Sequence, residues 1–158
     1  MLLAVRIPSG ALKIVKEVLR HLLRRPVVGI AAAARTADGR LLLIRRADSG
    51  KWALPGGTLE WGETLRGSIE RELLEETGAR VTHLGELIGV YSAPTRDPRF
   101  HAVTVVVAAT VGEPDQASVN PLEITEIGLF HDHELPRDYS HGMEDIVKNV
   151  VLKNVVWE

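Results

Sequence analysis

Three glutamates crowd one short segment of the chain, since Glu72, Glu75 and Glu76 fall within five positions of the run GTLEWGETLRGSIERELLEETGA at 57–79. On a helix, side chains at positions i, i+3 and i+4 converge on one patch of the surface. Hard divalent cations prefer oxygen ligands, and Mg²⁺ above all suits a patch of carboxylates. The segment therefore predicts a metal site formed by one helix.

The helix expected over 65–77 would turn an apolar stripe toward a core. The stripe consists of Leu65, Ile69 and Leu73. Glu72 falls beside this stripe and Glu76 falls within it, where an ordinary surface helix would place no charge. A desolvated carboxylate costs several kcal/mol unless it is paired or binds a metal. Arg71 alone cannot neutralise three glutamates, so a further cation is required.

The whole stretch resembles the Nudix box, whose pattern is G-x5-E-x7-R-E-U-x-E-E-x-G-U with U bulky and apolar. The matching positions are Gly57, Glu63, Arg71, Glu72, Leu73, Glu75, Glu76, Gly78 and Ala79. A random match of this kind is about a 10⁻⁸ event per window, so the resemblance is specific. Ala79 is smaller than the residue usual at the last position, which weakens packing there and leaves the chemistry unchanged.

The resemblance implies an enzyme that uses a divalent metal to cleave nucleoside diphosphates linked to another moiety. Mg²⁺ is the expected ion, and Mn²⁺ is expected to substitute for it. By position, the resemblance assigns four metal ligands: Glu72, Glu75, Glu76 and the carbonyl oxygen of Gly57. Glu76 is also expected to be catalytic, and Glu63 would brace Arg71 to order the loop before the helix.

A further carboxylate from a loop outside the box often joins the metals or acts as a base in this family. Its motif position, six residues before a usual Trp, falls on Glu123, with Leu129 in the place of the Trp. We therefore expect Glu123 to be a metal ligand and a catalytic residue. Glu126 is the near rival, and either side chain could instead be simply exposed.

Four arginines are candidate substrate ligands. Arg45 and Arg46 alternate on a predicted strand, so only one of them can face the surface that the box helix leaves open. The alternative for both is an exposed basic edge. Arg96 and Arg99 lie in a loop with Pro94, near where Nudix enzymes acting on ADP-ribose often carry a proline.

The bulk composition indicates a single globular domain, with 158 residues of which 45% are apolar and 25% charged. A net charge of −2 argues against a nucleic-acid binder that relies on phosphate contacts. The chain has no cysteine, which fits a reducing compartment such as the cytoplasm. No apolar run reaches transmembrane length, and we expect no membrane partner.

The charge is uneven, because residues 1–25 contain six Lys and Arg against only Glu17 and the remainder carries −7. Residues 10–25 have an apolar stripe at helical spacing, and Pro26 ends the helix. The stripe comprises Leu12, Val15, Leu19, Leu22 and Leu23. Packing on the domain or on a second subunit is the favoured interpretation, and we expect a homodimer. A membrane-surface or targeting segment is the alternative.

The remaining pattern alternates strands with helices and indicates an α/β fold. Strands are expected over 27–35, 40–46, 51–54, 80–91, 101–112 and 127–131, and a closing helix over 142–157. The first two strands should form a hairpin at Asp38-Gly39. The Nudix resemblance implies an α/β/α sandwich with a mixed sheet. The helix at 1–25 would be appended to a Nudix domain at 26–158.

The leading functional hypothesis is Mg²⁺-dependent hydrolysis of a nucleoside diphosphate sugar, such as ADP-ribose, to a nucleoside monophosphate and a sugar phosphate. One alternative is a nucleoside triphosphate diphosphatase that removes oxidised or non-standard dNTPs. Another is a regulator that senses nucleotide without cleaving it, although a pure binder has no need to retain all three metal-binding glutamates of the helix.

Overall fold

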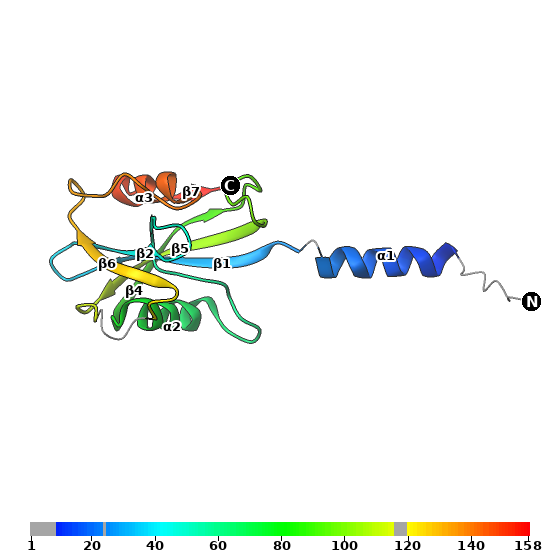
Figure 1. Cartoon of the computed structure of the whole chain (residues 1–158), viewed down its shortest axis with the longest axis horizontal. Coiled ribbons are helices and arrows are strands. Elements are labelled where there is room, and N and C mark those ends of the chain that lie inside the picture. The colour runs from blue at the N-terminus through cyan, green and yellow to red at the C-terminus, as the bar shows by residue number, and fades with distance from the viewer. Residues whose placement is uncertain (1–8, 24, 116–119) are drawn as a thin grey trace, which may run out of the picture.

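A seven-stranded mixed sheet lies between helices in the computed structural model, which describes residues 9–23, 25–115 and 120–158 (Figure 1). In chain order the elements are α1 (Ser9–Leu23), β1 (Val27–Arg35), β2 (Leu41–Arg46), β3 (Trp52–Ala53), α2 (Leu65–Thr77), β4 (Val81–Tyr91), β5 (Ala102–Val111), β6 (Ile124–Phe130), α3 (Met143–Leu152) and β7 (Val156–Trp157). The sheet order is β3-β2-β1-β5-β4-β7, and β6 pairs with β2. The predicted α/β class and mixed sheet are confirmed.

Strand β1 divides its hydrogen bonds between β5 and a loop. Along one edge it pairs in parallel with β5 over its whole length. It pairs with β2 only where Arg35 faces Leu41, so the predicted hairpin is antiparallel but short. On this second edge, the amide N–H of Ile30 donates to the carbonyl oxygen of Gly57 at 2.9 Å, and that of Ala32 donates to Pro55 at 2.8 Å. The sheet itself thereby fixes the loop that carries Gly57.

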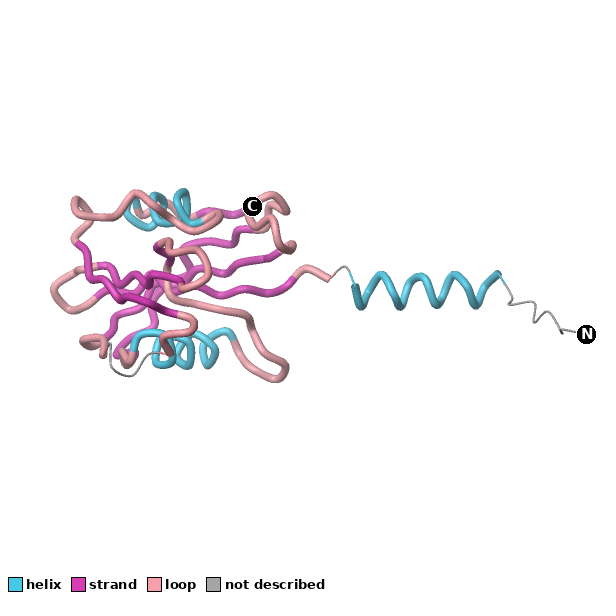
Figure 2. Tube along the Cα trace, in the orientation of Figure 1, coloured by secondary structure: helices cyan, strands magenta, loops and turns pink. Residues whose placement is uncertain are grey.

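The two faces of the sheet bury separate cores, because side chains alternate along β1. Ile30, Ala32 and Ala34 point to the core that includes Ile69 and Leu73 of α2. Ala31 and Ala33 point to the opposite core, to which α3 contributes Ile146, Val147 and Val150. Figures 1 and 2 show α2 and α3 on opposite sides of the sheet. The layers are those of the predicted α/β/α sandwich.

The prediction of one closing helix over 142–157 is wrong after Leu152. Helix α3 ends at Leu152, and Lys153 adopts a left-handed conformation with φ of 55°. The chain then turns to form β7, which pairs in parallel with β4. The backbone of Val156 and Trp157 pairs with that of Gly89 and Val90 at the edge of the sheet, and this pairing overrides the helical spacing of the apolar residues.

Helix α1 extends away from the sandwich, as Figures 1 and 2 show. Its described apolar side chains are between 48% and 67% exposed. They are Leu12, Ile14, Val15, Val18 and Leu19. The side chains of Leu22 and Leu23, and the whole of residues 1–8 and 24, lie outside what the structure describes. No helix among the described residues is long and apolar enough to cross a membrane.

Candidate active site

Helix α2 is capped at both ends by the residues that the box supplies. The side chain of Thr64 accepts a hydrogen bond from the amide of Gly67, which satisfies a free donor of the first turn. Gly78 ends the helix in a left-handed conformation and donates its N–H to the carbonyl oxygen of Leu74. The helix buries Glu76 on the same face as Ile69. A glutamate therefore lies in the apolar stripe, as the spacing predicted.

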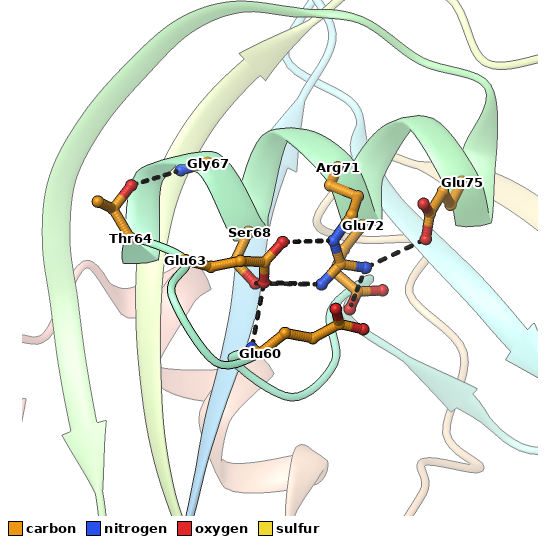
Figure 3. A network of polar contacts seen from close by, with 8 residues as sticks. All are labelled: Glu60, Glu63, Thr64, Gly67, Ser68, Arg71, Glu72 and Glu75. Atoms are coloured by element: carbon orange, nitrogen blue, oxygen red, sulfur yellow. Dashed lines mark hydrogen bonds and ion pairs between the residues drawn. The ribbon is translucent and has the colours of Figure 1, made fainter.

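Glu63 and Arg71 form a two-pronged ion pair that joins the loop to the helix (Figure 3). Arg71 donates from Nε to Oε1 of Glu63 at 2.8 Å and from Nη2 to Oε2 at 3.0 Å. The hydroxyl of Ser68 and the amide of Glu60 also donate to Glu63. These donors, Arg71 first, lower the pKa of Glu63 to about 2. The pair holds the loop of the box in place.

Arg71 also contacts two of the three glutamates of the predicted metal site. Its Nη1 lies 3.0 Å from Oε1 of Glu72 and 3.1 Å from Oε2 of Glu75 (Figure 3). Glu72 is largely buried, and that burial raises its pKa despite the nearby guanidinium. The Glu75 side chain is 60% exposed and does not line the cavity that Glu72 shares with Glu76. The three glutamates therefore have unequal environments.

Glu76 is the most deeply buried carboxylate of this group, with 8% of its surface exposed. Its Oε2 accepts a hydrogen bond of 2.7 Å from the amide of Gly56. Burial, first of all, and the nearby charge of Glu72 raise the pKa of Glu76 to about 8. A carboxylate in this position requires a nearby cation to stay ionised at neutral pH.

A cavity of about 340 Å³ brings together side chains from three parts of the chain. It is lined by Arg46, Asp48, Gly56, Gly57, Glu72, Glu76, Leu122, Glu123 and Ile124. Glu123 lies in the turn just before β6. Its carbonyl oxygen accepts a 2.7 Å hydrogen bond from the amide of Ala47, which holds this turn in place. Carboxylates predicted from distant sequence positions thus meet at one place.

Glu126 and Arg45 lie outside this cavity and contact each other. Strand β6 begins at Ile124, earlier than predicted, so Glu126 is a strand residue opposite Arg45. Nη1 of Arg45 lies 3.1 Å from Oε2 of Glu126, and Nε donates to the carbonyl oxygen of Gly50. Of the two alternating arginines, Arg46 is the one that lines the cavity.

A second cavity of about 310 Å³ adjoins the first and shares Arg46, Gly56 and Gly57 with it. The loop at 92–100 contributes Arg96, Asp97, Arg99 and Phe100 to this second cavity. Arg99 is 49% exposed, so part of its guanidinium remains accessible to solvent. One side of the combined space is therefore rich in carboxylates, and the other holds arginines, an aromatic ring and Asp97, which lies 2.7 Å from Nη2 of Arg99.

Arg96 is held by carboxylates at the C-terminal end of the described chain. Its Nη1 and Nη2 lie 2.9 Å and 2.7 Å from the two oxygens of Asp145, and its Nε lies 3.0 Å from Oε2 of Glu158. Its Cζ is 4.6 Å from the centre of the Tyr91 ring. This arginine fixes the loop at 92–100 against α3 and the chain end.

Asp48 is a member of the site that the sequence did not single out. It lies 2.8 Å from Nη2 of Arg46 and 3.3 Å from Nη1 of Arg99, so it bridges the two cavity arginines. Its hydrogen bonds to Arg46, above all, lower its pKa to about 2. The signal in the sequence was its position two residues after Arg46, just beyond the strand.

The donors at the first cavity fit a hard divalent cation. They are oxygens only, from Glu72, Glu76, Glu123 and the backbone of Gly57, and buried carboxylates need a compensating charge. In the described part of the chain, no three acidic, histidine or cysteine side chains are already arranged as a metal-binding group. Glu72 faces Arg71 and Glu76 faces an amide, so both carboxylates would turn to bind an ion.

Comparison with known proteins identifies the family of this chain. The model of the NUDIX domain matches residues 23–150. An "ADP-ribose pyrophosphatase" from Methanocaldococcus jannaschii is 46% identical over 72 residues, which are 44% of this chain and 42% of that protein. A "Putative 8-oxo-dGTP diphosphatase" from Bacillus subtilis is 29% identical over 121 residues, which are 73% of this chain and 79% of that protein. The match to the first of these relatives thus spans less than half of its length.

Solved structures show the same architecture. The crystal structure of a MutT NUDIX hydrolase from Burkholderia pseudomallei superposes with a TM-score of 0.69 and 31% identity. The alignment covers 80% of this chain and 99% of that one.

Proposed function

The chain belongs to the Nudix family, and from this premise we propose that it hydrolyses the diphosphate linkage of a nucleoside diphosphate sugar resembling ADP-ribose. One observation carries the proposal: the cavity of carboxylates and the cavity of cations share Arg46, Gly56 and Gly57. A diphosphate bound at this junction would present its anionic oxygens to both. The flanking nucleoside or sugar would extend toward Phe100.

Divalent metal ions are generally used by this family, and we propose Mg²⁺, with Mn²⁺ able to replace it. Glu72, Glu76, Glu123 and the Gly57 carbonyl oxygen would hold the ion. When bound, it would supply positive charge to the diphosphate oxygens and favour ionisation of the attacking water. Glu75 lies at the margin of this set, because Arg71 engages it and it is exposed.

The residues of the chain have separate roles in the proposed reaction. Arg46 and Arg99 would bind non-bridging oxygens, where negative charge increases in the transition state. The water oxygen forms a bond to one phosphorus while the bridging P–O bond breaks, and Glu123 takes a proton from the water. Arg71 and Glu63 only keep α2 and its loop in register. The products are a nucleoside monophosphate and a sugar phosphate.

A second candidate is hydrolysis of an oxidised or non-standard nucleoside triphosphate to a monophosphate and pyrophosphate. The observation that favours it is the likeness to the Bacillus subtilis relative, which extends over 73% of this chain. The loop at 92–100 favours the first candidate, since Arg99 and Phe100 extend the cavity beyond the carboxylates.

The deciding experiment is a substrate panel with product identification. The purified chain is incubated with Mg²⁺ and ADP-ribose, other nucleoside diphosphate sugars, 8-oxo-dGTP or ordinary dNTPs, and the products are separated by anion-exchange chromatography. We expect AMP and ribose 5-phosphate from ADP-ribose, and no hydrolysis after chelation by EDTA. A kcat/KM that is higher for 8-oxo-dGTP would select the second candidate. No turnover of any of these substrates would contradict both.

A further inference from the structure

Helix α1 presents a broad apolar face that its own domain does not cover. At 100° per residue, the described apolar side chains occupy an arc of about 160°. These are Leu12, Ile14, Val15, Val18 and Leu19, all about half exposed or more. A helix of this length is marginally stable in water by itself. The face therefore requires another surface.

The other side of α1 is strongly basic. Lys13, Lys16 and Arg20 lie on it, and Arg24 and Arg25 follow in the sequence. The only acidic residue, Glu17, lies 2.7 Å from Arg20 in an ion pair. An apolar arc of about 160° is wider than the seam of a two-helix coiled coil. Pairing of two α1 helices alone would therefore leave part of the apolar face uncovered.

Exposed apolar side chains also surround the start of β1, where α1 joins the domain. Val28 accepts a hydrogen bond through its carbonyl oxygen from Leu59, two residues before Trp61. The Trp61 side chain is fully exposed. On the other side, the amide of Val27 donates to the carbonyl oxygen of His101, and Phe100 next to it is 43% exposed. An indole and a phenyl ring thus lie near the base of the helix.

Against the expectation of no membrane partner, we propose that α1 binds an anionic lipid surface, which was the alternative interpretation of its sequence. Its aliphatic face would enter the boundary between headgroups and acyl chains, and its lysines and arginines would remain among the negative headgroups. Trp61 and Phe100 would contact the same interface, since aromatic rings are favoured at that depth. The inference does not depend on which substrate the active site takes.

This placement brings the active site close to the lipid headgroups. Val27, Arg99 and Phe100 line the second cavity, and Val27 is the first residue of the strand that follows α1. The chain would therefore act on nucleotides at the membrane surface.

Vesicle sedimentation of the full chain tests the proposal. Vesicles of phosphatidylcholine alone are compared with vesicles containing about 30% phosphatidylglycerol, at 0.1 M NaCl. We expect binding to the anionic vesicles to be at least about tenfold stronger, and to weaken at 0.5 M NaCl as charges are screened. A chain that stays in the supernatant with anionic vesicles at 0.1 M NaCl would overturn the proposal.

Paired variants identify the surface that binds. Val15→Gln with Leu19→Gln removes apolar area from α1, and we expect binding to fall at least about tenfold. Leu152→Gln with Val155→Gln is the matched control, because these side chains are also exposed but lie at the end of α3 and just before β7. The control should bind like the wild type. Equal binding of both double variants and the wild type would contradict the role of α1.

The basic face and the aromatic residue have matched controls as well. Lys13→Gln with Lys16→Gln should weaken binding to anionic vesicles, whereas Lys51→Gln with Lys148→Gln should not. Trp61→Ser should weaken binding more than Trp157→Ser, since both indoles are exposed and Trp61 belongs to the segment that pairs with the start of β1. Equal effects within either pair would contradict the geometry proposed for that face.

A second copy of the chain is the competing partner for α1. Light scattering at micromolar concentration separates the two cases. If the wild type is a dimer, Val15→Gln with Leu19→Gln makes it monomeric, and anionic vesicles bind neither form, then α1 is a subunit interface and the membrane proposal is wrong. Hydrolysis of soluble nucleotides should be unchanged in this variant, so failure here is distinct from failure of the proposed reaction.

Discussion

Gly57 lies so close to Glu72 that a Cβ atom on Gly57 would stand 2.2 Å from Oε1 of that carboxylate. The backbone and the side chain are therefore matched to one another at the point where the two cavities meet. The contact restricts residue 57 to glycine for as long as Glu72 keeps its position.

Gly57→Ala should reduce kcat by about 10- to 100-fold, because the methyl group displaces the Glu72 carboxylate from the cavity. The melting temperature should change little, since the displaced atoms are the end of a flexible side chain. Gly67→Ala is the control, because its Cβ would meet only Thr64 at 3.4 Å. Wild-type kcat in Gly57→Ala would show that the position of Glu72 is unimportant.

Glu76→Gln should lower kcat by about 100-fold or more while the fold is retained, because it removes a buried negative charge and keeps the size of the side chain. The amide oxygen of the new residue can still accept the hydrogen bond from Gly56. Glu75→Gln should have a smaller effect, since Glu75 is exposed and outside the cavity. Steady-state kinetics with Mg²⁺ measures both, and a larger loss in Glu75→Gln would contradict the proposed ligand set.

Arg46→Gln should lower kcat/KM by about 10- to 100-fold through the loss of a phosphate ligand. Arg45→Gln makes the same chemical change at the next residue, where the side chain faces Glu126 and the Gly50 carbonyl. We expect its kinetics to stay near the wild type. An equal loss of kcat/KM in the two variants would contradict the assignment of Arg46, and not Arg45, as the phosphate ligand.

Glu123→Gln should reduce kcat by about 10- to 1000-fold with little change in KM, as for a group that acts mainly in the transition state. Glu126→Gln is its matched control, because that carboxylate pairs with Arg45 on β6. A greater loss in Glu126→Gln would move the proton acceptor into the strand and would refute the assignment from the turn.

The contribution of Glu158 to stability should depend on pH. Its hydrogen bonds, first of all those from Arg96, lower its pKa from an ordinary value of 4.5 to about 2. A lowered folded-state pKa contributes stability above about pH 4.5, and this contribution is lost as the pH falls toward 2. The free energies of unfolding in urea of Glu158→Gln and the wild type should therefore differ most near pH 7, differ less at pH 3 and converge near pH 2. A difference that is constant over this range would contradict the ion pair.

The box helix could be predicted to the residue because its signals are local. Thr64 and Gly78 directly flank the first and last residues of the helix, and Ile69 and Leu73 supply its apolar stripe from within. The start of β6 depends instead on pairing with β2, which is about 80 residues away. Because of this long-range pairing, Glu126 belongs to strand β6, whereas Glu123 stays in the turn that precedes the strand.

The roles of arginines were less predictable, because a cation in a loop looks the same whether it binds a ligand or a distant carboxylate. Arg96 is engaged by Glu158, 62 residues later. The end of the chain was expected to be helical, which gave no reason to bring Glu158 near the loop. The alternation of Arg45 and Arg46 was useful because strand geometry alone allows only one of them to face the cavity.

The two halves of the proposed site share Arg46, Gly56 and Gly57, and Asp48 of the first half contacts Arg99 of the second. The loop at 92–100 is anchored from outside the box, by Asp145 and Glu158. Substitutions in this loop can therefore change recognition of the substrate while the carboxylates of the other half stay the same. In protein engineering, residues 92–100 could be exchanged as a unit, provided that Arg96, Asp145 and Glu158 are retained.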